Sequence, residues 1–113
     1  MLRDETIQRV LNFRDDRDWR QFHTAKDLAI SMNLEAAELL EIFQWSGSNV
    51  DCDESQLAKL RDELADVLSY CILMADVCGL DLDEIMNAKV AKNEAKYPVE
   101  KARGSAAKYT ELK

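Results

Sequence analysis

Residues 53–79 read DESQLAKLRDELADVLSYCILMADVCG, and this stretch decides the fold. Its apolar residues recur every three or four positions, as on one face of a helix, at Leu57, Leu60, Leu64, Val67, Cys71, Met74 and Cys78. Asp53 stands where an N-cap would accept a backbone hydrogen bond, and Gly79 stands where a left-handed residue would end the helix. The stretch therefore predicts one amphipathic helix of about 25 residues.

Two more helices are predicted before this stretch. Residues 3–17 carry an apolar stripe with helical spacing, although the end of this segment is poorly marked. Thr24 and Asp27 resemble a capping box, and the apolar residues that follow them keep helical spacing until Gly47. The polar residues between this helix and Asp53 predict a short loop.

A fourth helix is predicted to begin after Asp81, where Glu84 completes the pattern of a capping box, and to end near Lys96 because Pro98 disfavours its continuation. Four amphipathic helices with short links predict an all-α, antiparallel four-helix bundle. We expect one helical domain over residues 1–98 and a C-terminal tail over residues 99–113. A core this small would be completed by oligomerisation.

The composition favours a soluble cytoplasmic protein of one domain. The chain has 113 residues, of which 47% are hydrophobic, and it shows neither a secretory signal nor an apolar run long enough to span a membrane. Its three cysteines form no C-x-x-C pair, so no disulfide framework or zinc ribbon is expected, and Cys71 and Cys78 are predicted to be core thiols. The net charge of -7 argues against binding to a nucleic-acid polymer.

Two pairs of carboxylates have a spacing that permits joint coordination of a ligand. Glu35 and Glu38 are three residues apart on the second predicted helix, and Glu63 and Asp66 are three apart on the third. Such pairs are common on solvated helix surfaces, which is the alternative interpretation. Both pairs continue into apolar stripes, however, one through Ile42 and Trp45 and the other through Tyr70, Leu73 and Val77. We therefore expect both pairs to face inward or into a cleft.

Several carboxylates in a cleft would repel one another and lose hydration unless they were protonated or bound to a cation. Ligands that are all carboxylate oxygens favour Mg2+, or Mn2+ as a substitute, over Zn2+, and Mg2+ also accepts substrate phosphates. A di-iron bundle is the competing metal site, but it requires Glu-x-x-His motifs, and His23 is the only histidine and lies outside such a motif. The pattern favours magnesium with a phosphate-bearing ligand.

Further motifs follow one another from about Phe13 to Pro98. They are Arg17-Asp18-Trp19-Arg20-Gln21-Phe22-His23, Glu35-x-x-Glu38-x-x-Glu41-x-x-x-Trp45, Glu63-x-x-Asp66 and Lys89-x-x-x-Asn93-x-x-x-Tyr97-Pro98. In this order they resemble the MazG-like nucleotide pyrophosphohydrolases, most closely the dCTP pyrophosphatase branch. The resemblance implies an all-α homotetramer, a dimer of dimers, that cleaves a nucleoside triphosphate between its α and β phosphates.

The resemblance also implies roles for individual residues. Glu35, Glu38, Glu63 and Asp66 match the magnesium ligands and catalytic residues, with Glu38 as the candidate that orients the attacking water. Substrate contacts are implied for Trp19, His23, Trp45, Tyr70, Lys89, Asn93 and Tyr97. Without the resemblance, Lys89 and Asn93 would be interpreted as solvated residues, and both tryptophans could equally be core packing.

Two functions follow from these features. The first is a Mg2+-dependent pyrophosphohydrolase that converts dCTP, or a related or modified nucleotide, to the monophosphate and pyrophosphate and so removes unwanted nucleotides. The alternative is a non-catalytic helical module that binds a nucleotide or a protein partner, which the small size and the large apolar stripes favour. Consumption of the triphosphate would distinguish the two.

Overall fold

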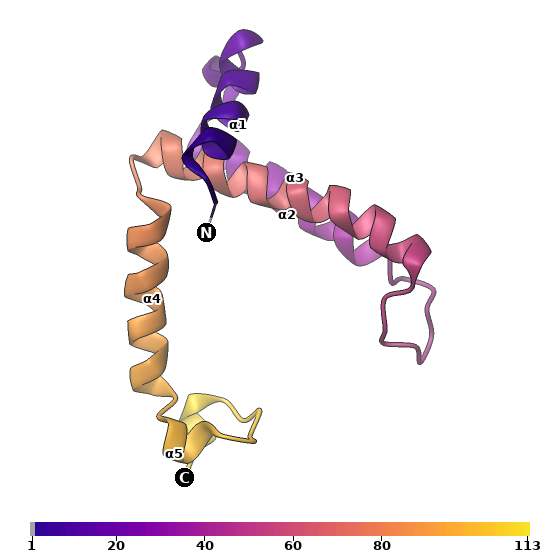
Figure 1. Cartoon of the computed structure of the whole chain (residues 1–113), viewed down its shortest axis with the longest axis vertical. Helices are drawn as coiled ribbons and strands as arrows, with labels where there is room; N and C mark the ends of the chain where they lie inside the picture. Colours follow the sequence, from indigo (N-terminus) through magenta and orange to yellow (C-terminus); the bar gives the residue numbers. More distant parts are fainter. Residues whose placement is uncertain (1) are drawn as a thin grey trace. The chain divides into compact units, whose positions relative to one another are not determined.

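The computed structural model of the protein describes residues 2–113 (Figure 1). Its helices are α1 (Asp4–Asp16), α2 (Ala25–Glu41), α3 (Glu54–Cys78), α4 (Leu82–Lys96) and α5 (Val99–Ala102), with the 3-10 turns η1 (Arg20–Phe22) and η2 (Tyr109–Glu111). No strand occurs within residues 2–113, so the predicted all-α class is confirmed. In the described residues, no helix combines the length and the apolar character needed to cross a membrane.

The chain forms two compact units, one ending at Gly79 and the other covering Leu80–Lys113. In the first unit, α2 and α3 lie side by side as an antiparallel hairpin, and α1 packs against α3 (Figure 1). The second unit contains α4, α5 and η2. A place for α4 in a four-helix bundle, and the division into a domain of residues 1–98 and a tail of residues 99–113, stay predictions.

Helix α3 begins and ends where the sequence predicts. The Asp53 carboxylate accepts a hydrogen bond from the Gln56 backbone N–H at 2.8 Å, and Gln56 Oε1 accepts one from the Asp53 N–H at 2.9 Å. This reciprocal pair is a complete capping box. Gly79 takes the left-handed conformation, with φ of 66°, directly after the last helical residue. The two ends give α3 the predicted length of 25 residues.

The N-caps of α2 and α4 also form at the predicted residues. Thr24 Oγ1 accepts a hydrogen bond from the Asp27 backbone N–H at 3.1 Å. Asp81 Oδ1 accepts one from the Glu84 backbone N–H at 3.0 Å. Each bond satisfies a backbone donor that the first turn of a helix leaves without an intrahelical partner.

Helix α2 ends earlier than predicted, at Glu41 rather than near Gly47. The backbone N–H groups of Phe43 and Gln44 bond to carbonyls three residues back, at 3.0 and 3.1 Å. This spacing tightens the chain into successive turns in place of a further α-helical turn. Trp45 consequently lies on a turn and not on the helix that carries Glu35 and Glu38.

Helix α1 ends in a Schellman motif centred on Asp18, which is left-handed with φ of 56°. The Trp19 N–H bonds to the Arg14 carbonyl at 3.1 Å, and the Asp18 N–H bonds to the Asp15 carbonyl at 3.0 Å. Aspartate tolerates this conformation better than most residues, so glycine is not required here. The motif ends the helix and places Trp19 directly after it.

The first unit has a small core. Its buried residues are Arg14, Leu28, Ile72, Leu73 and Ala75. The apolar stripe predicted on α3 is only partly buried, because Leu60 and Val67 are half-buried while Leu57 and Leu64 are exposed. Cys78 is also exposed, so its prediction as a core thiol is wrong, because α3 ends at this residue. Part of the apolar surface of the hairpin formed by α2 and α3 is therefore not buried within the first unit.

Candidate active site

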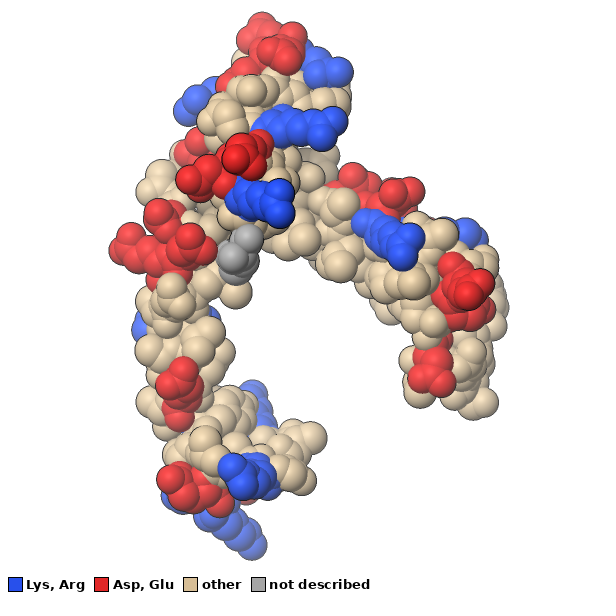
Figure 2. All heavy atoms as spheres, in the orientation of Figure 1, with Lys and Arg blue, Asp and Glu red and all other residues tan. Residues whose placement is uncertain are grey.

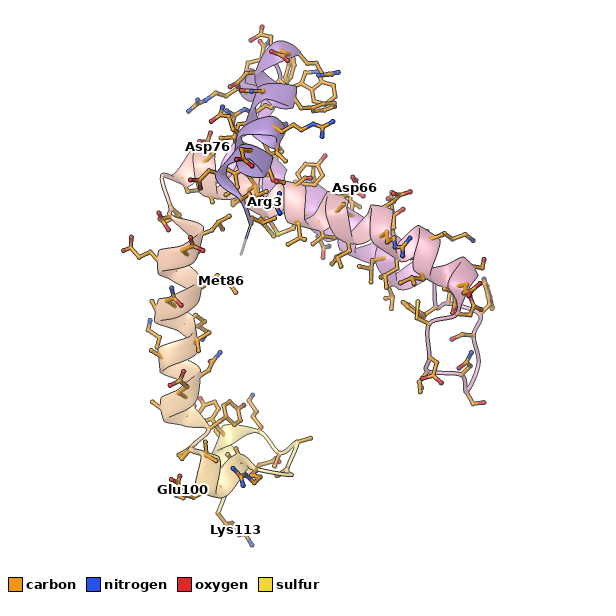
Figure 3. The ribbon with its side chains drawn as sticks, in the orientation of Figure 1. Arg3, Asp66, Asp76, Met86, Glu100 and Lys113 are labelled. Atoms are coloured by element: carbon orange, nitrogen blue, oxygen red, sulfur yellow. The ribbon has the colours of Figure 1, made fainter. Side chains whose placement is uncertain are left out.

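The hairpin brings acidic side chains of both predicted pairs together. Carboxylate oxygens of Glu35, Glu63 and Asp66 all lie within 4.8 Å of one another. Glu35 comes from α2, and the other two come from the middle of α3, where Figure 3 labels Asp66. Two neighbouring helices thus hold the three carboxylates in one place.

Two of these carboxylates are partly withdrawn from water. Glu35 and Glu63 are half-buried, whereas Glu38 and Asp66 are exposed. One oxygen of each half-buried group, Oε2, is buried and has no hydrogen-bond partner. A buried carboxylate oxygen without a partner carries a desolvation penalty that a bound cation would offset. A fully solvated acidic surface therefore does not describe Glu35 and Glu63.

The crowding raises the pKa of both half-buried glutamates. Burial is the largest cause for Glu35, whose pKa rises to about 7, and a hydrogen bond to Glu38 and the charge of Glu38 follow. Burial and the same two effects of Glu38 raise the pKa of Glu63. Neighbouring negative charges disfavour ionisation of a further carboxyl group. We therefore count Glu38, although its side chain is exposed, with Glu35, Glu63 and Asp66, and call these four residues the acidic cluster.

The donor set of the acidic cluster fits a hard divalent cation. It consists of carboxylate oxygens, with no sulfur or imidazole ligand of the kind that favours zinc. Magnesium binds a few carboxylates at a time and fills its remaining positions with water or phosphate oxygens. Glu35, Glu63 and Asp66 would hold such an ion, and the exposed Glu38 would lie on the side that is open to solvent.

Two of the predicted substrate contacts, Trp19 and His23, follow α1. The Trp19 ring meets the Phe13 ring edge to face, with centroids 5.6 Å apart. His23 follows η1, and its Nδ1 is buried without a hydrogen-bond partner. Burial, and then the charge of Arg14, lower the pKa of His23. These effects favour the neutral imidazole, in which one nitrogen donates and the other accepts.

The other two predicted aromatic contacts lie on the hairpin. Tyr70 is half-buried on α3, two helical turns after Glu63. Trp45 is 88% exposed on the turn after α2. Core packing within this chain therefore does not account for Trp45, and a large exposed ring is available for a ligand or another chain.

The remaining predicted substrate contacts are on α4. Lys89 and Asn93 are four residues apart on α4 and so share one helical face, Tyr97 follows directly after the last helical residue, and all three are exposed. The Tyr97 backbone N–H bonds to the Asn93 carbonyl at 2.9 Å at the end of the helix. These residues belong to the second unit, and their approach to the acidic cluster stays a prediction.

Arg14 is a buried charged residue to which the sequence assigned no role, and it is only 2% exposed. Its guanidinium donates to Asp76 at 2.7 Å and to Asp15 at 2.9 Å. The pKa of Arg14 is raised above its ordinary value, with the hydrogen bond to Asp15 as the largest cause. Figure 3 labels Asp76 where α3 meets α1. The ion pair therefore fastens α1, and the turn that carries Trp19, to the hairpin.

Comparison with known proteins places these features in a family. A sequence model described as the MazG-like family matches residues 30–112. The chain belongs to the MazG-like family. In this MazG-like protein the matched residues include the whole acidic cluster and α4.

The MazG-like chain is 38% identical to dCTP pyrophosphatase 1 of Mus musculus, in an alignment that covers 96% of this chain and 66% of the mouse protein. It is 37% identical to dCTP pyrophosphatase 1 of Homo sapiens, with the same coverage of each chain. The chain thus spans about two thirds of the length of the curated relatives it matches. The predicted resemblance is confirmed at the level of the family.

A solved structure supports the MazG-like fold. The crystal structure of a pyrophosphatase from Archaeoglobus fulgidus superposes with a TM-score of 0.76 at 40% sequence identity. The superposition covers 84% of this chain and 91% of the archaeal chain. The similarity extends well beyond the hairpin.

We expect the metal-free MazG-like protein to lose stability as the pH rises from about 5 to 8. The folded pKa of Glu35, about 7, exceeds its ordinary value of 4.5, so the folded chain binds more protons than the unfolded chain between these values. This contribution to stability is complete below the ordinary pKa and is lost as the pH rises through the folded pKa. Melting temperatures measured with a chelator at each pH check the direction.

Glu35→Gln provides the matched control for this pH dependence, because glutamine keeps the shape of the side chain and removes its titration. The difference between the melting curves of the wild type and the variant isolates Glu35 from His23, which titrates in the opposite sense because its pKa is lowered. Equal pH slopes for the two proteins would contradict the expected shift.

Proposed function

We propose that the chain hydrolyses dCTP, or a related or modified nucleoside triphosphate, to the monophosphate and pyrophosphate with Mg2+. The observation that carries this proposal is the acidic cluster, in which two half-buried glutamates with unpaired oxygens lie within reach of Asp66. The name of the relatives, dCTP pyrophosphatase 1, supports the reaction and the substrate. In this proposal the protein clears unwanted nucleotides from the cytoplasmic pool.

The residues of the acidic cluster would bind the metal ion and orient the attacking water. Glu35, Glu38, Glu63 and Asp66 would hold Mg2+, or Mn2+ as a substitute, which when bound neutralises phosphate charge and stabilises the charge that develops in the transition state. Glu38, on the solvent side, would orient the attacking water and take up its proton. The water oxygen forms a bond to the α-phosphorus, the bond to the α–β bridging oxygen breaks, and pyrophosphate leaves.

Further residues would recognise the substrate. Lys89 would supply a positive charge to the triphosphate, and Asn93 and Tyr97 would supply hydrogen bonds. Trp19, Trp45 and Tyr70 offer flat rings that can stack on a nucleobase. His23, held neutral, can donate or accept one hydrogen bond at the base or sugar. These assignments rest on the order and spacing of the sequence motifs between Phe13 and Pro98.

Incubation with each deoxynucleoside triphosphate tests the proposal, with Mg2+, with Mn2+ and with a chelator. We expect metal-dependent conversion, fastest for dCTP or a related nucleotide, to the monophosphate and pyrophosphate. In water enriched in oxygen-18, attack at the α-phosphorus places the label in the monophosphate, whereas attack at the β-phosphorus places it in pyrophosphate. Release of orthophosphate alone, or label in pyrophosphate, would overturn the proposed reaction.

The same incubation separates the enzyme from a binding module. A module could raise its melting temperature with a nucleotide and leave that nucleotide intact, since any ligand that prefers the folded state stabilises it. An enzyme consumes the triphosphate during long incubation. Intact nucleotide together with a raised melting temperature would favour the module.

We propose further that the chain assembles as a homotetramer, a dimer of dimers. Exposed leucines along the hairpin support assembly, because each leaves a large apolar side chain that a second chain could cover: Leu34, Leu40, Leu57, Leu64 and Leu68. Light scattering coupled to gel filtration should give about four times the chain mass of 12.9 kDa. A mass of one chain at micromolar concentration would contradict the assembly.

A further inference from the structure

The segment after α4 folds back on itself and is not an extended tail. Helix α5 follows Pro98 at once, and Gly104 then reverses the chain with φ of 73°. Ser105 Oγ accepts a hydrogen bond from the Ala107 N–H at 3.2 Å, and the Glu111 N–H bonds to the Lys108 carbonyl at 2.8 Å. Figure 1 shows this last part of the chain lying beside α5 at the end of α4.

The returning segment brings Tyr109 against the last residues of α4. The rings of Tyr109 and Tyr97 meet edge to face, with centroids 6.0 Å apart and planes at 80°. Lys96 Nζ lies over the Tyr109 ring, 4.9 Å from its centroid. Both arrangements are electrostatically favourable, because the positive edge of one ring, or a cation, meets the negative face of another. One aromatic ring therefore holds two neighbouring side chains.

These contacts limit the freedom of Tyr97. Its backbone is already fixed, because its N–H bonds to the Asn93 carbonyl at 2.9 Å and Pro98 follows it. Contact with Tyr109 also restricts the rotation of its ring. Tyr97 and Tyr109 are 37% and 41% exposed, so the Tyr97 ring is held and still accessible to a ligand. Holding a side chain before binding reduces the entropy that a ligand must overcome.

We propose that Tyr109 is a positioning residue for the nucleotide, acting by fixing the ring of Tyr97 and the ammonium group of Lys96. The folded C-terminal segment would then be part of the substrate site. Residues 99–113 contain four basic residues, Lys101, Arg103, Lys108 and Lys113, against two acidic ones, Glu100 and Glu111, and this positive balance suits a ligand with several negative charges. Figure 2 shows both kinds of side chain on this last part of the chain. The inference rests on the proposed function, in which Tyr97 contacts the nucleotide.

Steady-state kinetics with dCTP and Mg2+ on the full chain test this inference. Tyr109→Ala should raise KM by about 3- to 10-fold and leave kcat within about twofold, because the ring orders the site and touches no reacting atom. Tyr109→Phe keeps the ring and should restore the wild-type KM. Thr110→Ala, at the exposed neighbouring position, is the matched control and should have no effect.

Tyr109→Leu covers the case in which the alanine variant fails to fold, since leucine keeps apolar bulk without an aromatic face. It should raise KM in the same direction, and the NMR signals of the Tyr97 ring should move because the ring current of Tyr109 is gone. An active wild type whose KM is unchanged in the alanine and leucine variants would overturn the inference alone. A wild type that leaves every nucleotide intact would overturn the proposed function, and this inference with it.

Discussion

Glu63→Gln should lower kcat/KM by about 100-fold or more while the chain still folds. Glutamine has the shape of glutamate, but it lacks the charge through which a half-buried ligand would hold Mg2+ near Glu35 and Asp66. The raised pKa of Glu63 shows that the fold disfavours its negative charge, so the metal-free variant should melt no lower than the wild type. Steady-state kinetics and thermal melting measure the two effects.

Glu54→Gln is the matched control for this experiment, because it makes the same chemical change at an exposed position in the first turn of the same helix. It should keep activity within about twofold and stability within about 0.5 kcal/mol. Mg2+ should raise the melting temperature of the wild type and of this control, but not that of Glu63→Gln. Activity of Glu63→Gln within tenfold of the wild type would show that Glu63 is not needed for the metal.

Arg14→Met should lower the free energy of unfolding by about 2–3 kcal/mol, the second large effect we expect. Methionine fills part of the same space, but it leaves Asp76, whose side chain is 31% exposed, without its partner at 2.7 Å. Loss of the Arg14–Asp76 ion pair weakens the packing of α1 against α3, because this ion pair joins the two helices. Urea unfolding followed by circular dichroism measures the change, at one protein concentration so that assembly does not alter the comparison.

Arg9→Met is the matched control, since Arg9 is exposed on the same helix and its replacement should cost no more than about 0.5 kcal/mol. Asp76→Asn and the double variant complete a thermodynamic cycle with Arg14→Met. A positive coupling energy of about 1 kcal/mol or more is expected. Additive effects would mean that Arg14 stabilises the fold by packing and not through Asp76.

Local signals explain why both ends of α3 could be predicted clearly, whereas the end of α1 is poorly marked and the C-terminal end of α2 is predicted too late. Asp53 and Gly79 are residue types that begin and end helices by their own chemistry. The turn after α1 is made by Asp18, in a left-handed conformation that glycine adopts more often. Helix α2 ends in tight turns, and no glycine or proline precedes Gly47 to mark that end. Residues that permit both a helix and a turn leave the choice to packing.

In the candidate active site, too, local sequence signals predict some features and long-range packing decides others. Helical periodicity placed Glu35 and Glu63 on inward faces, so a cluster of carboxylates could be predicted before any contact was known. The role of Arg14 could not, because its partner Asp76 is 62 residues away and nothing in the local pattern names it. The role proposed for Lys89 likewise comes from the order of the family motifs and not from the spacing within α4.

Except for Tyr70 on α3, the residues proposed to contact the base lie on turns outside the helices that carry the carboxylates, and the early end of α2 is what places Trp45 on such a turn. Glu35, Glu38, Glu63 and Asp66 are on two long helices, whereas Trp19, His23 and Trp45 are on short turns that flank them. Turns accept substitutions and changes of length more readily than packed helices do. The reaction centre could thus stay constant while the turns diverge, and one scaffold could acquire a preference for a different base without rebuilding its chemistry.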